Sequence, residues 1–280
     1  MGGPTGERGR GGGADPHVRG TGAVRGLTRL EVDAAVLAGG EREPGLPPGL
    51  PNKAFLPVAG KPLVERVVEA LRATPQVRRV ALVAPGAVPE ALARVCHRVV
   101  PDQGSLLANV EAAVAAFPDA SWVLACAADL PLLSPQAVAH FLEACAARTA
   151  DFYYGIVRRE DLEARFPGAR KTFVRVREGS FTGSSLVLLR PEVVERVRPL
   201  LRQAAEARKN PARLASLLGS AYVVKYLTGR LGVADVERRA FELTGLRGAA
   251  VVCPDPEVAL DVDVGKPENL ELAERLLQQA

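Results

Sequence analysis

The sequence predicts an α/β protein in which helices cover both faces of a mostly parallel β-sheet. Residues 34–37, 80–83 and 122–126 are apolar throughout rather than at every second position, which is typical of parallel strands that are buried on both faces. Segments with helical spacing separate these runs. A regular alternation of strand and helix indicates a doubly wound sheet, because parallel neighbours need a crossover connection, usually a helix.

Each predicted helix in this half of the chain has its own start signal. Pro62 stands at the first position of a helix whose apolar residues repeat at helical spacing as far as Leu71, and proline is favoured at that position. Ser105 precedes a second helical pattern, and Ser134 precedes a third that ends near Arg148. Serine before an apolar helical run is a common N-cap, so these three starts are consistent with one another.

The pattern becomes less regular after Asp151. We expect several strands in this half, with a polar loop after the first of them and a closing helix that begins at Pro267. The predicted strands are residues 152–157, 172–176, 186–189, 249–253 and 259–264. Such irregular pieces often extend a sheet over its ligand.

A helical appendage is expected between these strands. Residues 192–246 have mostly helical patterns, with breaks at Lys209-Asn210-Pro211 and at Thr228-Gly229. We therefore predict one domain over residues 31–280 that includes a helical insertion at about 192–246.

The first 30 residues differ from the rest in composition. They are rich in glycine and hold five arginines against two acidic residues, whereas the whole chain has a formal net charge of +4. A segment with so few large apolar side chains cannot offset the entropy of ordering, so we predict a disordered tail. Weak binding of RNA by this tail is an alternative. The remainder is nearly neutral, so no nucleic-acid partner is expected for the core domain.

No apolar run near Met1 has the form of a signal peptide, and none is long enough to span a membrane. The sequence therefore predicts a cytoplasmic protein without a membrane partner. The four cysteines are widely scattered, which favours reduced, buried thiols over a zinc site. The three histidines show no ligand or triad spacing, and no serine or cysteine nucleophile is indicated.

Two glycines follow the first predicted strand directly, in the run Leu37-Ala38-Gly39-Gly40. Glycines at a strand end allow the backbone to approach a phosphate and to direct its N–H groups at it. A tight turn with no ligand is the alternative. The run is neither a Walker loop nor a dinucleotide fingerprint.

A loop rich in proline and glycine then leads to Lys53, which precedes an apolar run that we expect to be a strand. A lysine at this place could neutralise charge on a transferring phosphoryl group. A merely solvated lysine is the alternative.

Acidic residues follow two predicted strands. Asp129 comes after the strand that ends at Ala128, and Asp261 and Asp263 alternate in a later run, so that they are expected to face the same side. Ligands of open α/β sheets bind outside the carboxyl ends of the strands, where these carboxylates would lie. Carboxylates there suit a Mg²⁺ ion that is held jointly with substrate phosphates. For Asp129 alone, the start of a turn before Pro131 is the alternative.

Together these motifs resemble the MobA-like family of nucleoside-triphosphate transferases, which includes molybdenum-cofactor guanylyltransferases. The resemblance runs from about Ala34 to Leu277. The motifs that carry it are Leu37-Ala38-Gly39-Gly40, residues 52–62 from Asn52 to Pro62, Asp129-Leu130-Pro131, Asp261-Val262-Asp263 and Pro267-Glu268-Asn269-Leu270.

The resemblance implies a Rossmann-like sheet of the glycosyltransferase-A type and a reaction that transfers a nucleoside monophosphate to an acceptor with release of pyrophosphate. It implies catalytic roles for Lys53 and Asp129, and Mg²⁺ (or Mn²⁺) bound by Asp129 and Asp263. The implied nucleotide contacts are Leu37, Ala38, Gly39, Gly40, Lys53, Gln103, Gly104 and Ser105. Thr182 and Gly183 resemble part of the family's acceptor-side loop, and Lys171 and Arg170 are nearby and could contact phosphate on this acceptor side. The partners would then be a nucleoside triphosphate and an unknown small-molecule acceptor.

The chain departs from the family pattern at two places. Glu41-Arg42-Glu43-Pro44-Gly45 stands where relatives usually have a Ser-x-Arg-Met-Gly run, and Ser184-Ser185 stands where many have Gly-Asn. The same motifs are consistent with two other functions. One is a glycosyltransferase that uses a nucleotide sugar, although its acidic motif normally lies in mid-chain. The other is a non-catalytic nucleotide-binding protein on the same fold.

Overall fold

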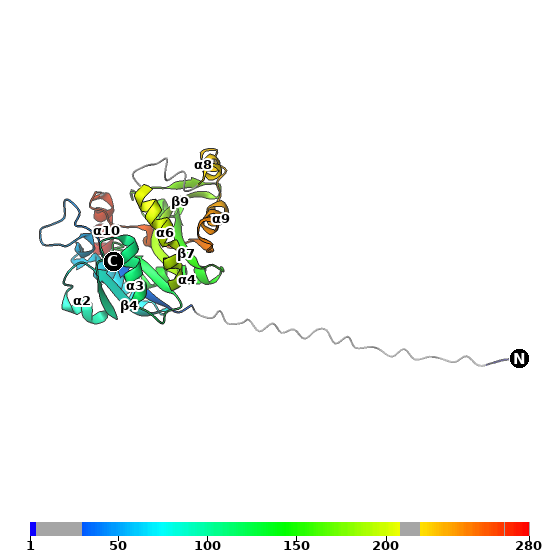
Figure 1. Cartoon of the computed structure of the whole chain (residues 1–280), viewed down its shortest axis with the longest axis horizontal. Helices are drawn as coiled ribbons and strands as arrows, with labels where there is room; N and C mark the ends of the chain where they lie inside the picture. Colours follow the sequence, from blue (N-terminus) through cyan, green and yellow to red (C-terminus); the bar gives the residue numbers. More distant parts are fainter. Residues whose placement is uncertain (4–29, 208–218, 266, 280) are drawn as a thin grey trace.

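The computed structural model describes residues 1–3, 30–207, 219–265 and 267–279. Its centre is an eight-stranded sheet, in which seven strands follow the order β10-β7-β9-β6-β1-β4-β5 and the eighth, β8, pairs with β9 (Figure 1). The strands are β1 (Val32–Leu37), β4 (Val77–Ala84), β5 (Arg98–Pro101), β6 (Val123–Ala127), β7 (Phe152–Arg158), β8 (Val174–Val176), β9 (Gly179–Leu189) and β10 (Gly248–Val252), and β2 (Pro57–Val58) pairs with β3 (Lys61–Pro62) in a separate ribbon.

The sheet is mostly parallel, as the sequence predicts. β1 lies between β4 and β6 and is parallel to both, and β4 is parallel to β5. β9 is the exception, because it runs antiparallel to β6 on one side and to β7 on the other. The fully apolar runs of β1, β4 and β6 are thus central strands, which explains why they lack a polar face.

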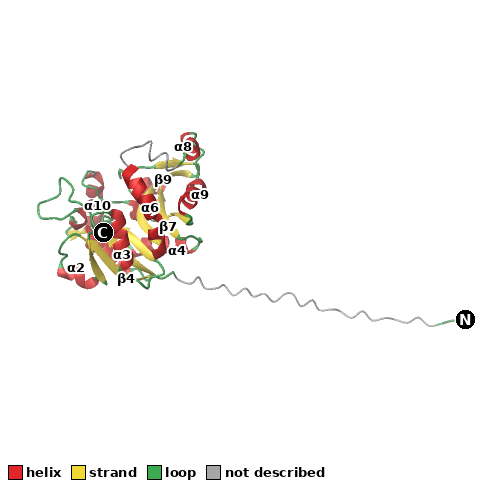
Figure 2. Ribbon diagram, in the orientation of Figure 1, coloured by secondary structure: helices red, strands yellow, loops and turns green. Residues whose placement is uncertain are grey.

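Helices cover both faces of the sheet (Figure 2). On one face α1 and α4 pack against each other, and α3 and α6 pack together on the other. The helices are α1 (Leu63–Ala73), α2 (Glu90–Val95), α3 (Leu106–Ala115), α4 (Pro135–Ala146), α5 (Arg159–Arg165), α6 (Pro191–Ala207), α8 (Ser220–Leu227), α9 (Val233–Thr244) and α10 (Pro267–Gln279), with single 3₁₀ turns η1 (Lys53–Phe55) and η2 (Pro256–Ala259). Ser105 and Ser134 are the N-caps of α3 and α4, as predicted.

The two faces of the sheet have separate apolar cores. Along β1, Ala34 and Val36 point into the large core below α1 and α4. Ala35 points the other way, into the smaller core against α3. All three side chains are completely buried. The doubly covered sheet of the prediction is therefore confirmed at the level of individual residues.

Three local predictions are wrong. The polar loop expected after residue 157 contains helix α5. The strand expected at 259–264 does not form, because Ala259 ends η2 and the following residues contain no more than an isolated bridge at Asp263. Lys53 does not precede a strand directly but begins η1, whose N-cap is Asn52. For Lys53 the reason is a side-chain cap, because Asn52 accepts the backbone N–H of Ala54, and the apolar pattern does not contain this signal.

The helical insertion is present in the part of the chain that the structure describes. It consists of α6, α8 and α9, with the predicted break at Thr228-Gly229 between the last two. The expectations for residues 4–29 of the tail and for Lys209-Asn210-Pro211 fall outside the described residues. The limits of the domain at 31 and 280 stay a prediction.

The described helices are too short or too polar to cross a membrane, and the cytoplasmic location stays a prediction. Cys126, Cys145 and Cys253 are buried free thiols, whereas Cys96 is half-buried. Burial raises the pKa of the Cys253 thiol to about 12, so this thiol stays protonated and inert, as the sequence predicts.

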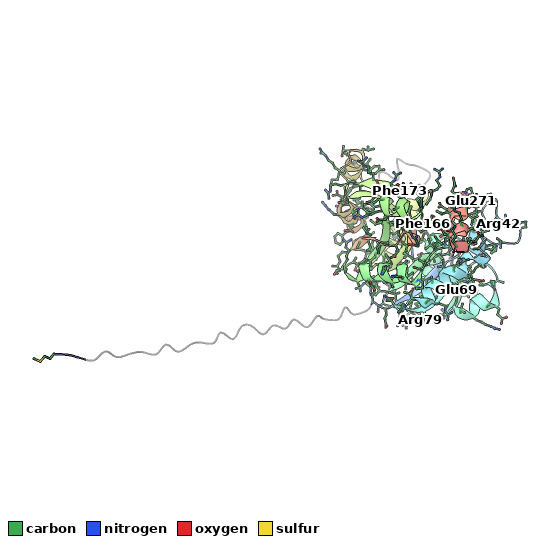
Figure 3. All side chains as sticks on the ribbon, turned by 180° about the vertical axis from the view of Figure 1, so that it is seen from behind. Arg42, Glu69, Arg79, Phe166, Phe173 and Glu271 are labelled. Carbon is green, nitrogen blue, oxygen red and sulfur yellow. The ribbon has the colours of Figure 1, made fainter. Side chains whose placement is uncertain are left out.

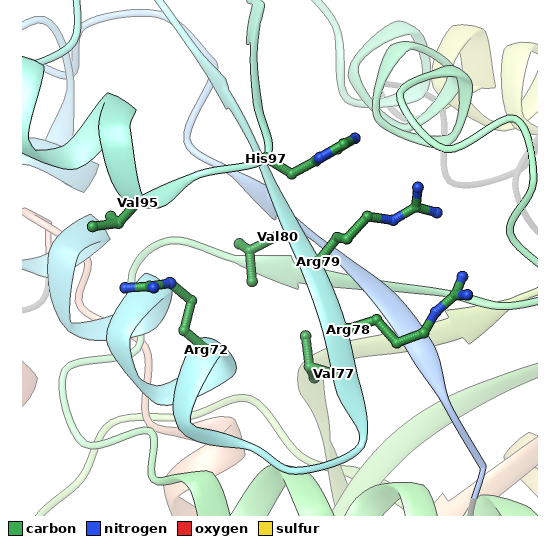
Figure 4. A pocket seen from close by; sticks show the side chains of 7 residues that line it. All are labelled: Arg72, Val77, Arg78, Arg79, Val80, Val95 and His97. Carbon is green, nitrogen blue, oxygen red and sulfur yellow. The ribbon is translucent and has the colours of Figure 1, made fainter.

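One buried carboxylate stabilises the sheet at the opposite end from the predicted site. Asp33 is completely buried in β1, where Arg79 Nε and Nη2 donate to its two oxygens at 2.9 and 2.7 Å and Arg78 adds a third hydrogen bond at 2.6 Å. The same arginines line a cavity of about 270 Å³ at the start of β4 (Figure 4). None of the predicted site residues lines this cavity.

Candidate functional site

The Gly39-Gly40 turn follows β1 at its carboxyl end, and both positions exclude a side chain. Gly40 has φ +114°, a conformation that other residues rarely adopt. A Cβ atom on Gly39 would lie 2.5 Å from Asp102 Oδ1 and at least as close to Asn109 Nδ2. The first glycine thus allows a close approach of side chains, and the second allows the backbone to turn.

Asp102 is the residue that holds this turn. Its carboxylate accepts hydrogen bonds from the backbone N–H of Gly40 at 3.0 Å, from that of Gly104 at 3.1 Å, and from Asn109 Nδ2 at 2.7 Å. The Gly40 bond comes first among the causes that lower the pKa of Asp102 below its usual range. Sequence reasoning missed Asp102 and Asn109, although Asp102 follows the carboxyl end of β5 directly.

The segment Gln103-Gly104-Ser105 lies beside the turn because of these bonds. Gln103 donates its backbone N–H to Asn109 Oδ1 at 2.7 Å, and Gly104 has φ +75°. Ser105 Oγ accepts the backbone N–H of Ala108 at 3.2 Å, so its hydroxyl caps α3. All three residues are exposed. Gln103 also lines a groove of about 740 Å³ between α3 and α6.

Asn52 connects the turn to Lys53. This buried amide donates to the carbonyl oxygen of Ala38 at 2.7 Å and accepts the backbone N–H of Ala54 at 3.0 Å. Its side chain therefore fixes the start of η1 against the backbone of the glycine turn. As a consequence, Lys53 begins its 3₁₀ turn next to the end of β1.

Lys53 reaches Asp129, which lies just beyond the carboxyl end of the neighbouring strand β6. The ammonium nitrogen is 2.9 Å from Asp129 Oδ2 and 3.6 Å from Glu43 Oε1. The second oxygen of each carboxylate, Asp129 Oδ1 and Glu43 Oε2, is buried and has no hydrogen-bond partner within the described part of the chain. Sequence reasoning paired Lys53 with phosphate and did not identify Glu43.

The second acidic motif reaches the same place through a backbone bond. Val262 N–H donates to the carbonyl oxygen of Asp129 at 2.9 Å, so Asp261 and Asp263 lie on either side of this contact. Asp263 accepts the backbone N–H of Gly265 at 2.9 Å and is close enough to raise the pKa of Lys53. The structure thus brings Lys53, Asp129 and Asp263 together, as the sequence predicts, without the predicted strand.

The site around Lys53 holds more carboxylates than ammonium groups, and the pKa values of Lys53 and Asp129 are both shifted. Burial raises the pKa of Asp129, an effect that Lys53 opposes and Asp261 reinforces. Burial lowers the pKa of Lys53, but Asp129, Glu43 and Asp263 more than offset this and raise it. The raised pKa of Lys53 reflects three carboxylates around one ammonium group, a setting that favours an added cation.

The residues present suit a hard divalent cation. Asp129 offers a buried carboxylate oxygen without a partner, and Asp263 supplies a second carboxylate nearby. Within the described ranges no group of three or more His, Cys, Asp or Glu residues is arranged to hold a metal ion. Mg²⁺ usually takes one or two carboxylates and completes its shell with substrate phosphates and water, so a two-carboxylate site fits it.

The predicted acceptor-side residues lie on the other flank of the acidic motif. Lys171 Nζ donates to Asp261 Oδ1 at 2.7 Å and is nearly buried. Thr182 and Gly183 belong to strand β9 and not to a loop, which corrects the sequence-based picture. A Cβ atom on Gly183 would meet the hydroxyl of Tyr154, so a side chain there would require the Tyr154 ring to move. Cys126 of β6 lies opposite Leu186 of β9, so Gly183 continues past the end of β6 toward the level of Asp129.

Asn269 holds the acceptor flank to the acidic motif. It is completely buried at the start of α10. Its Nδ2 donates to the carbonyl oxygens of Asp261 at 3.0 Å and Arg170 at 3.2 Å, and its Oδ1 accepts the backbone N–H of Arg170 at 2.7 Å. One amide therefore sets the distance between Lys171 and the acidic motif.

Comparisons with known proteins bear on the family and the fold of the chain. The model of the MobA-like NTP transferase domain family matches residues 34–218. A solved structure described as a hypothetical transferase from Thermus thermophilus is 38% identical, with a TM-score of 0.76, over 85% of this chain and 99% of the other. A search of curated proteins found no significant match.

More distant structures share the fold. A CMP:2-keto-3-deoxy-manno-octonic acid synthetase in complex with CTP is 16% identical, with a TM-score of 0.53, over 89% of this chain and 99% of that one. A 4-diphosphocytidyl-2C-methyl-D-erythritol synthase from Anaerococcus prevotii is 10% identical, with a TM-score of 0.52, over 90% of this chain and 98% of that one. The Rossmann-like α/β architecture predicted from sequence is confirmed by these likenesses.

Proposed function

The chain belongs to the MobA-like NTP transferase family, and from that premise we propose that it is a Mg²⁺-dependent nucleotidyltransferase. It transfers a nucleoside monophosphate from a nucleoside triphosphate to a phosphate or hydroxyl acceptor and releases pyrophosphate. The observation that carries the proposal is the contact of Lys53 Nζ with Asp129 Oδ2 at 2.9 Å, beside the Gly39-Gly40 turn and next to Asp263.

In this reaction an acceptor oxygen forms a bond to the α-phosphorus while the bond from that phosphorus to the bridging oxygen of the β-phosphate breaks. Pyrophosphate leaves with that bridging oxygen, and a hydroxyl acceptor gives up its proton to solvent. Such a transfer needs little covalent help from the protein, so positioning and charge stabilisation provide most of the rate enhancement.

The residues of the site divide these tasks. Lys53 donates hydrogen bonds to the phosphate chain and stabilises the charge that develops on leaving pyrophosphate. The glycine turn lets the phosphate chain of the nucleotide pass close to the protein backbone. Gln103, Gly104 and Ser105 face the base or ribose from the exposed start of α3. Lys171, Thr182 and Gly183 border the acceptor.

Asp129 and Asp263 are the residues that would hold Mg²⁺, or Mn²⁺ in its place. The bound ion would neutralise phosphate charge and orient the triphosphate. Asp129 suits this role because one of its oxygens is buried without a partner in the described part of the chain.

The proposal is tested first by nucleotide binding. Thermal unfolding of the full chain is measured with ATP, CTP, GTP, UTP and two nucleotide sugars, each with and without Mg²⁺. A triphosphate at 100 times its Kd stabilises the native state by about 2.7 kcal/mol, which raises Tm by several degrees. The triphosphate that stabilises the protein is then used in an acceptor screen that detects pyrophosphate.

The test variant is Asp129→Asn, and the matched control is Asp119→Asn. Asp129→Asn is expected to abolish the Mg²⁺-dependent shift, whereas Asp119 is an exposed partner of Arg79, far from the site, and its loss should leave the shift intact. A shift with nucleotide sugars alone would support a glycosyltransferase instead. A shift with a triphosphate but no pyrophosphate release in the acceptor screen would support a non-catalytic nucleotide-binding protein, and no shift with any ligand would contradict the proposal.

A further inference from the structure

Glu43 has no place in the proposed reaction, yet it contacts the central residue of the site. Its Oε1 lies 3.6 Å from Lys53 Nζ. Its other carboxylate oxygen is buried and lacks a hydrogen bond in the part of the chain described. The two side chains are about one-third and one-quarter exposed. Among the described residues Lys53 is the ion-pair partner of this half-buried carboxylate, so the ammonium group is its main stabilising partner there.

The loop that carries Glu43 is fixed on both sides of it. Arg42 donates its guanidinium to the carbonyl oxygens of Leu46 and Pro47, which closes the loop on itself. The Leu46 side chain is buried in a small apolar cluster with Val262. Gly45 packs so closely on Val264 that a Cβ there would lie 3.2 Å from it. The loop therefore sits against the acidic motif, and Figure 3 shows Arg42 at the same end of the molecule as Glu271 of α10.

Because the backbone is anchored by Leu46 and Gly45, Glu43 faces Lys53 from a preset position. About one-third of the Glu43 side chain is exposed, so rotation about its own bonds can move the carboxylate away from Lys53 without moving the loop. A second carboxylate, Asp102, likewise occupies the N–H of Gly40 at 3.0 Å. Both donor groups that face the phosphate chain in the proposed reaction are thus paired with protein carboxylates.

We propose that Glu43 is an internal competitor of the phosphate chain, which occupies Lys53 in the free protein and must leave it when a triphosphate binds. The inference rests on the proposed function in one respect, because it takes Lys53 to be the phosphate contact. It adds a residue that sets the affinity for polyphosphate and that the family pattern does not contain at this place.

The physical reason is electrostatic. A carboxylate and a triphosphate are both anions, and two like charges at contact distance in a partly buried site repel each other strongly. The negative charge of Glu43 also offsets part of the electrostatic attraction between the Lys53 ammonium group and phosphate. Replacing the carboxylate by an amide of the same shape removes both effects. The gain should grow with the number of phosphates, because each added phosphate brings charge near Lys53.

The experiment measures the binding of inorganic tripolyphosphate and of orthophosphate by titration calorimetry, in EDTA, to three forms of the full chain. They are the wild type, Glu43→Gln and the matched control Glu41→Gln, which removes the same charge from an exposed position two residues earlier. We expect Glu43→Gln to bind tripolyphosphate about tenfold more tightly than wild type, with a smaller gain for orthophosphate. Glu41→Gln should differ from wild type by less than about twofold.

Three results would overturn the inference. They are an unchanged affinity in Glu43→Gln, an equal gain in Glu41→Gln, and a weaker affinity in Glu43→Gln, which would make Glu43 a supporting ligand. A double variant Glu43→Gln/Lys53→Ala provides a second check, since the gain must vanish when Lys53 is absent. If the tripolyphosphate effect appears but no nucleoside triphosphate binds, the inference holds and the proposed function fails.

Discussion

Val262 donates its backbone N–H to the carbonyl oxygen of Asp129 at 2.9 Å. This one bond joins two acidic motifs that are more than 130 positions apart in the sequence. It places Asp261 and Asp263 on either side of Asp129 and therefore brings the second acidic motif to Lys53. The predictions below test the separate parts of this group.

Lys53→Ala is expected to weaken binding of the selected nucleoside triphosphate by tenfold or more, since a hydrogen bond to a charged group contributes about 1.5–3 kcal/mol. The corresponding monophosphate should lose less than about threefold, because it lacks the β- and γ-phosphates. Calorimetric titration with both ligands measures the difference. Lys61→Ala is the control, as Lys61 pairs with Glu69 on the surface. Equal losses for both ligands would remove the phosphate role from Lys53.

The affinity for Mn²⁺ should depend on pH through Asp129. Only the ionised carboxylate binds the cation, and burial holds the pKa of Asp129 above its usual range. Affinity should therefore fall, as pH decreases, at a higher pH than an ordinary aspartate would cause. Electron paramagnetic resonance of free Mn²⁺ between pH 4 and 8 measures this. A pH profile that is the same in wild type and Asp129→Asn would contradict the assignment.

The ionised carboxylate of Asp102 should stabilise the folded protein at neutral pH, and this contribution should be lost in acid. Its pKa is lowered in the folded state by the Gly40, Asn109 and Gly104 bonds. A group with a depressed folded pKa stabilises the protein above its unfolded pKa, and this contribution is lost as pH falls through the folded value. Asp102→Asn should therefore lower Tm at pH 7 and flatten the loss of Tm between pH 5 and 3. If the Tm of Asp102→Asn falls as steeply with decreasing pH as the Tm of wild type, other carboxylates cause the acid destabilisation.

Asn269→Ala should destabilise the protein by about 2–4 kcal/mol, because three hydrogen bonds of a buried amide are lost. It should also weaken Mn²⁺ binding, since the segment with Asp261 and Asp263 loses its support from Asn269. The matched control is Asp33→Asn, a buried polar change remote from the site that should cost about 3 kcal/mol. Urea unfolding and Mn²⁺ titration of both variants separate the two effects. A normal Mn²⁺ affinity in Asn269→Ala would limit Asn269 to a structural role.

Much of the fold could be predicted because its signals are local. The apolar runs of β1, β4 and β6 identify central strands, since only strands buried on both faces lack a polar side. Ser105 and Ser134 identify helix starts, because a cap bonds within four residues of itself. The antiparallel insertion of β9 was not predicted. Pairing partners are chosen across the whole chain, and no local pattern records them.

The candidate site shows the same division. Gly39, Gly40 and Asp129 were predicted from their positions after strands, because the carboxyl ends of parallel strands meet at one edge of the sheet. Lys53 was predicted from its place before an apolar run, which begins with the 3₁₀ turn η1 and not with a strand. Glu43, Asp102 and Asn269 were not assigned roles. Each is an ordinary polar residue in a loop or at a helix start, and only its contacts distinguish it from a solvated one.

By itself the sequence determined the α/β class, the family resemblance, and the order of the glycine turn, the lysine and the two acidic motifs along the chain. Tertiary structure alone decided that Glu43 shares Lys53 with Asp129, that Asp102 binds Gly40, and that Asn269 holds Arg170 beside Asp261. The physical reason is the distance along the chain over which each kind of interaction acts. Propensity and periodicity act over a few residues, whereas charge pairing and buried hydrogen bonds depend on distances that exist only after the chain has folded.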